Sequence, residues 1–134
     1  MFEFLKDNLL KALAEVKDGS FYSKHDPARN YVAFTIDERD QSRLILTTTN
    51  RDEVLTAHCP IRLNGEFTPF LAPMITKYVS DKSDVTCTSY PIHDWLKVTK
   101  AVVFAAAYDP GTRILTLSTI DSYATFNCKP WEKL

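Results

Sequence analysis

The sequence has few glycines, a nearly balanced charge and no long apolar run. Only 3 of its 134 residues are glycine, so it has no glycine-rich loop of the kind that cradles phosphates. Its 16 basic and 17 acidic side chains give a net charge of -1, which excludes a wholly basic nucleic-acid coat but not a local basic face. No apolar run approaches the roughly 20 residues that a membrane span needs. The remaining class is an ordinary globular domain, with 45% hydrophobic residues.

Cysteine is also scarce. Cys59, Cys87 and Cys128 make an odd number, and each lies in an apolar or strand-like run. No Cys-x-x-Cys pair exists, and the side chains of His58 and Cys59 would point to opposite faces of a strand. We therefore expect buried free thiols in a cytoplasmic protein, with no metal and no cofactor. The amphipathic, acidic start of the chain is unlike a secretory signal.

A pattern of one helix followed by three strands occurs twice. Residues 7–16 match residues 93–102, and residues 43–49 match residues 113–119, in pattern rather than in identity. A 3.6-residue period over residues 5–18 predicts a helix, ended by Gly19. Its buried stripe is predicted to be Leu5, Leu9, Ala12, Leu13 and Val16.

The remaining elements follow from β-branched runs and turn residues. Met74 to Val79 is predicted to be a short helix, and residues 62–82 fit the repeat least well. We therefore expect one α+β domain over residues 1–134, with residues 62–82 as an insertion. Strands are predicted at residues 31–36, 43–49, 53–61, 85–90, 102–108, 113–119 and 123–128.

These elements resemble the repeating domain of DNA sliding clamps, the processivity rings of polymerases. The resemblance covers nearly the whole chain except residues 62–82. It implies two β-α-β-β-β halves, with helices packed on one side of antiparallel sheets. In such clamps several domains, about six in total, close a ring whose helices line the DNA hole. The matching segments are Phe2-Glu3-Phe4, Leu9-Leu10-Lys11-Ala12-Leu13, Leu44-Ile45-Leu46-Thr47-Thr48-Thr49, Val85-Thr86-Cys87 and Pro91-Ile92-His93-Asp94-Trp95-Leu96-Lys97.

The second helix predicts a one-sided basic face. His93, Lys97 and Lys100 are expected opposite an apolar side made of Trp95, Leu96, Val98, Thr99 and Val102. Mobile ammonium groups suit non-specific contacts with the phosphates of double-stranded DNA. Lys11 would add to them from the first helix, although Asp7 and Asp18 accompany it. An ordinary solvated helix face explains the same residues.

Apolar residues gather where the repeat lapses. They either cover one end of a sheet or form a patch for a protein partner. Trp131 in the terminal segment is open to the same two interpretations. The candidate partner-binding residues are Phe67, Phe70, Leu71, Met74, Tyr78 and Trp131.

No catalytic constellation is predicted. His25-Asp26 and His93-Asp94 are the only histidine–acid neighbours, and nothing places a nucleophile beside either pair. We therefore expect a non-enzyme, and two hypotheses remain. The first is a small clamp-like processivity or tethering factor that self-associates through antiparallel edge strands. The second is a monomeric or dimeric protein-binding module, of the kind by which a phage or plasmid modulates a host protein.

Overall fold

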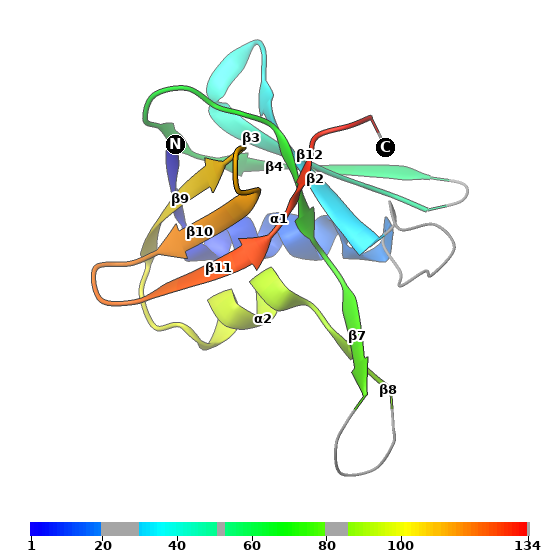
Figure 1. Cartoon of the computed structure of the whole chain (residues 1–134). Coiled ribbons are helices and arrows are strands. Elements are labelled where there is room, and N and C mark those ends of the chain that lie inside the picture. The colour runs from blue at the N-terminus through cyan, green and yellow to red at the C-terminus, as the bar shows by residue number, and fades with distance from the viewer. Residues whose placement is uncertain (20–29, 51–52, 80–85, 134) are drawn as a thin grey trace.

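The computed structural model describes residues 1–19, 30–50, 53–79 and 86–133, without the side chains of residues 78–79 and 86–87. Two antiparallel sheets pack over two helices that lie on the same side of them (Figure 1). The first half comprises β1 (Phe2–Leu5), α1 (Lys6–Val16), a 3-10 turn (Lys17–Gly19), β2 (Tyr31–Asp37), β3 (Asp40–Thr49), β4 (Val54–Pro60) and β5 (Arg62–Leu63). The second half comprises β6 (Phe70–Pro73), β7 (Thr76–Val79), β8 (Thr86–Ser89), α2 (Pro91–Val98), β9 (Val103–Asp109), β10 (Ile114–Ser118), β11 (Tyr123–Asn127) and β12 (Lys129–Pro130).

The two halves exchange their leading strands. The first sheet has the order β11-β10-β9-β1-β5, and the second has the order β12-β6-β2-β3-β4. The strand that opens each half therefore pairs with the first strand after the helix of the other half: β1 with β9, and β6 with β2. A phenylalanine pair marks each junction, with ring centroids 5.5 Å apart for Phe4 and Phe104 and 4.9 Å apart for Phe34 and Phe70. The expected α+β fold of two β-α-β-β-β halves is confirmed.

Helix α1 follows the predicted period closely. It buries Leu9, Ala12, Leu13 and Val16 against the sheets. Leu5 differs from the prediction, because it closes strand β1 and stays half exposed. Gly19 was predicted to end the helix itself, whereas α1 ends at Val16 and Gly19 ends the 3-10 turn that follows it.

Helix α2 is shorter than its pattern suggested. Ile92 and Leu96 are buried, but Val98 and Val102 are exposed. The predicted apolar side extended to Val102, whereas the backbone becomes extended at Thr99 with ψ of 128°. Residues beyond this point, including Val102, no longer follow the helical period. Val98 still lies within α2 but is exposed, so the prediction was wrong for both valines.

The range 62–82 contains three different structures. Phe70–Pro73 is β6, which lies inside the second sheet between β2 and β12. Thr76–Val79 is a strand rather than the predicted short helix, and it pairs only with β8 among the described strands. Figure 1 shows this β7–β8 hairpin projecting away from the body beyond α2. In the described part of this range, residues 64–69, residues 74–75 and strand β7 therefore lie outside both main sheets, and an insertion there stays a prediction.

Candidate functional site

The outward side of α1 carries charges of both signs. Lys11 is exposed, and Asp7 and Glu15 lie one helical turn before and after it. Side chains four residues apart on a helix are neighbours, so these carboxylates offset the charge of Lys11. Residues 6–19 carry three lysines and three acidic residues in total.

The other two lysines of the first helical region tie the helices together. Lys6 Nζ donates a hydrogen bond to the carbonyl oxygen of Thr99 at 2.8 Å. Lys17 Nζ lies 4.3 Å from the centroid of the Tyr90 ring. Thr99 follows α2 and Tyr90 precedes it, so the helices run antiparallel and are joined near both ends. These two lysines are therefore occupied with structural contacts.

His93 and Asp94 form the start of α2. Asp94 Oδ2 accepts hydrogen bonds from the Tyr90 backbone nitrogen at 3.1 Å and from Ser89 Oγ at 3.4 Å. His93 Nδ1 lies 3.4 Å from Asp94 Oδ1. Burial opposes ionisation of this carboxyl, but these hydrogen bonds and the nearby histidine lower the pKa of Asp94. The pair stabilises the helix start in the manner of a capping residue, since it satisfies a free backbone amide.

Lys97 and Lys100 are the exposed cations on the α2 side. Lys97 lies in the last turn of the helix, and Lys100 lies two residues beyond its end. Residues 91–100 contain these two lysines and one acid, Asp94. A single copy therefore presents only a slight positive excess along its helices.

Strands β4 and β11 are edges of the two sheets. Each is the third strand after the helix of its half, and none of the described strands pairs with its outer side. Neither strand contains Lys, Arg, Asp or Glu. Natural edge strands are usually protected by charges, bulges or covering segments, so uncharged strands of this length favour pairing with another strand. We call β4 and β11 the two free edges.

Half of the residues predicted as a partner patch are buried. Phe70, Leu71 and Met74 are buried, because β6 lies inside the second sheet. Phe67 is half buried, with its ring centroid 5.9 Å from that of Phe2. A partner could not reach the three buried side chains in this structure, so the predicted patch is corrected for them. The side chain of Tyr78 lies outside the described part of the chain.

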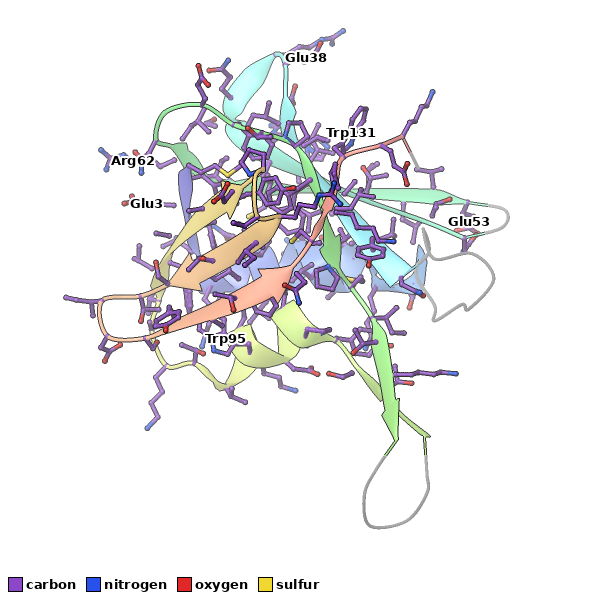
Figure 2. The ribbon with its side chains drawn as sticks, in the orientation of Figure 1. Glu3, Glu38, Glu53, Arg62, Trp95 and Trp131 are labelled. Atoms are coloured by element: carbon purple, nitrogen blue, oxygen red, sulfur yellow. The ribbon has the colours of Figure 1, made fainter. Side chains whose placement is uncertain are left out.

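Trp131 is different, because it is 47% exposed. Strand β12 pairs with β6, and Lys129 Nζ lies 4.8 Å from the centroid of the Tyr31 ring. These contacts hold the C-terminal segment against the outer face of the second sheet, where Figure 2 shows Trp131. A groove of about 270 Å³ follows there, lined by Ala33, Thr35, Thr47, Val54, Trp131 and Lys133.

The thiols are unsuited to nucleophilic chemistry. Burial raises the pKa of Cys59 and of Cys128 to about 12. His58 is exposed while Cys59 is buried, so the predicted opposite orientation is confirmed. Among the described residues, no three His, Cys, Asp or Glu side chains gather as metal ligands would. His25 and the side chain of Cys87 lie outside the described residues.

The sequence analysis expected self-association through edge strands but did not identify which strands are the edges. The uncharged stretches Val54–Pro60 and Tyr123–Asn127 are visible in the sequence. Their meaning depends on the strand order, which makes them edges rather than central strands.

Comparison with solved structures identifies the fold. A DNA polymerase sliding clamp from Caulobacter crescentus superposes with a TM-score of 0.74 at 12% identity, over 96% of this chain and 30% of that chain. The DNA polymerase III subunit beta from Pseudomonas aeruginosa gives 0.73 at 15% identity, over 100% and 32%. A DnaN sliding clamp from Bartonella birtlesii gives 0.72 at 12% identity, over 97% and 32%.

These matches confirm the resemblance to sliding clamp domains at the level of the fold. The chain spans about a third of the length of each clamp that it matches. No protein-family model and no curated protein sequence matches the chain. In the described part of the chain, no helix has the length and apolar character of a membrane span.

Proposed function

We propose that this chain, which has the fold of one sliding clamp domain, is a cytoplasmic, non-enzymatic scaffold associated with DNA. Copies would join edge to edge into a ring around double-stranded DNA and so act as a processivity or tethering factor. The observation that carries this proposal is the pair of free edges, β4 and β11, in a fold of this kind.

The two edges suit a head-to-tail assembly. They belong to different sheets, so pairing β4 of one copy with β11 of the next uses different surfaces on the two copies. Such contacts generate rings when the rotation between copies closes. Because one chain spans about a third of a clamp chain, several copies are needed to encircle DNA.

The helical face would then contact phosphates. Lys11, His93, Lys97 and Lys100 are the residues that we expect to face the DNA. Because each copy contributes only a slight positive excess there, binding by a single copy should be weak. A ring would add the contributions of all copies, and contacts with phosphates alone would be independent of sequence.

Retention on DNA of different topology tests this function. We expect the protein to remain on a nicked circular plasmid during gel filtration and to be lost after the plasmid is linearised, because a ring slides off free ends. Equal retention on both forms would indicate ordinary surface binding. Failure to bind either form, at salt concentrations down to about 50 mM, would contradict the proposal.

A second function, protein binding without encircling DNA, is favoured by one observation. Trp131 is half exposed beside a groove, and tryptophan is frequent among residues that dominate binding energy. The test compares the proteins that wild type and Trp131→Ala retain from a cell extract, with Lys133→Ala as a control at the groove rim. This function predicts a partner that only Trp131→Ala loses, while the protein stays monomeric. Identical profiles for all three proteins would contradict it.

A further inference from the structure

Exposed apolar side chains cluster at one end of the first sheet. Leu5 and Val103 are cross-strand partners, and the carbonyl oxygen of Val102 accepts a hydrogen bond from the Lys6 nitrogen at 2.9 Å. Val103 and Ile120 line one hollow together with Ser118, the cross-strand partner of Tyr123. We call this cluster the end patch: Leu5, Val102, Val103, Ile120 and Tyr123, all of them exposed.

The end patch is continuous with a free edge. Tyr123 begins β11, and Ile120 lies in the turn just before it. The Ile120 side chain is fully exposed, which is unfavourable for a branched aliphatic group in water. A contact made by β11 would therefore extend naturally onto Ile120.

A complementary hollow lies beside the other free edge. It has a volume of about 230 Å³, and its apolar wall includes Leu5, Pro60, Ile61 and Val103. Glu3 and Arg62 stand at its rim; they are cross-strand partners, and Figure 2 shows them at the same end of the molecule. We call it the end hollow. Pro60 is the last residue of β4, so the end hollow begins where that edge stops.

The directions of the two edges bring Ile120 and the end hollow together. In Figure 2, β4 runs between the labelled Glu53 and Arg62, and it therefore ends near Arg62. The arrow of β11 in Figure 1 points the opposite way, so the turn before β11 lies at the end where Arg62 lies. If neighbouring copies are related by a rotation about an axis parallel to the strands, each strand keeps its direction from one copy to the next. Copies joined edge to edge would thus place the β10–β11 turn beside the Pro60 end of the neighbouring β4.

We propose that Ile120 of one copy packs into the end hollow of the next copy and anchors the edge-to-edge contact. This inference rests on the self-association in the proposed function and specifies its main apolar contact. The exposed Asp121 follows Ile120, and Glu3 and Arg62 stand together at the rim of the hollow, so the fit rests on the apolar side chains rather than on charge. The apolar Ile120 side chain thus meets an apolar hollow.

Self-association of an Ile120→Ser variant is the first test. Serine at this position would lose the burial of the isoleucine side chain, so the dissociation constant should rise roughly tenfold or more. Val98→Ser is the matched control, because Val98 is an exposed valine outside both the end patch and the end hollow. We expect Val98→Ser to associate like wild type, and circular dichroism should show that both variants are folded.

A disulfide between Ile120→Cys and Arg62→Cys gives an independent test. Within one copy, β10 and β5 are separated by β9 and β1, so these positions are about 14 Å apart and cannot be bridged. Mild oxidation of the double variant should therefore link different copies, whereas each single variant should give no ladder above the wild-type background.

The outcomes distinguish a failure of the role of Ile120 from a failure of the proposed self-association. A wild-type protein that stays monomeric overturns both. A protein that associates, tolerates Ile120→Ser and forms no cross-link overturns only the role of Ile120. A selective loss with Ile120→Ser together with a cross-linked ladder supports the proposal.

Discussion

The two halves of the molecule use the same order of elements for different purposes. The first half holds its helix tightly: α1 buries four side chains, and Thr48 Oγ1 donates a hydrogen bond to the carbonyl oxygen of Val16 at 2.6 Å. The second half has the shorter α2, which buries two residues, and exposed valines follow it. Similar topology therefore does not imply similar surfaces. Both halves contribute to the core, but the second half presents most of the exposed large apolar side chains.

The largest expected effect comes from the contact that joins the halves. The Phe70 ring lies 4.9 Å from that of Phe34 in the first half and 4.6 Å from that of Tyr108 in the second, measured between centroids. Phe70→Ala should lower the free energy of unfolding by about 3–5 kcal/mol. A urea titration monitored by circular dichroism measures this change in the free energy of unfolding.

Phe67→Ala is the control for that change, because Phe67 is only partly buried. It should lower the free energy of unfolding clearly less. An equal effect of both variants would contradict a core centred on Phe70.

A smaller effect should distinguish the first half. A Cβ on Gly19 would collide with Thr48 Oγ1 and lie 3.1 Å from Leu55 Cδ1. Thr48 is fixed by its bond to Val16, so Gly19→Ala should destabilise by about 1–3 kcal/mol. Gly111→Ala in the second half is the matched control, because its Cβ would meet only Asp109 Oδ1 at 3.2 Å. Equal melting temperatures for the two variants would refute the tight contact at Gly19.

Alkaline pH should weaken both halves. Burial raises the pKa of Cys59 and Cys128 from an ordinary 9.0 to about 12. Between these values the unfolded chain loses thiol protons that the folded chain keeps, so stability present below pH 9 falls as the pH rises toward 12. Urea titrations at pH 7.5 and pH 10 measure the loss. Cys59→Ala should show a smaller pH-dependent loss than wild type, and an unchanged loss would contradict the role of this thiol.

The smallest effect on folding is expected on the helical face. Lys97→Glu with Lys100→Glu changes exposed residues, so the free energy of unfolding should move by less than about 0.5 kcal/mol for each. The same variant should lose salt-sensitive retention on circular DNA. Lys11→Glu is the corresponding change in the first half. It should reduce retention on circular DNA less than the double change does, because nearby acids already offset the charge of Lys11. If both variants stayed on circular DNA as wild type does, the helical face would not be the surface that binds DNA.

Residue patterns predicted the elements better than their partners. The apolar period of α1 and the β-branched strands follow from local rules, and the structure confirms them. The exchange of β1 and β6 depends on pairing between residues about 40 to 100 positions apart, which no local pattern encodes. Phe70 was therefore interpreted as a surface candidate although it is core. The weakness of the basic face was predictable, because Asp7 and Asp18 accompany Lys11 in the sequence.

The solution mass across a protein dilution series, measured by light scattering on a sizing column, tests the central claim most directly. Free edges that join copies predict a defined assembly whose mass is a multiple of 15.3 kDa and which dissociates reversibly on dilution. A species of 15.3 kDa at every concentration up to the millimolar range would contradict edge-to-edge assembly.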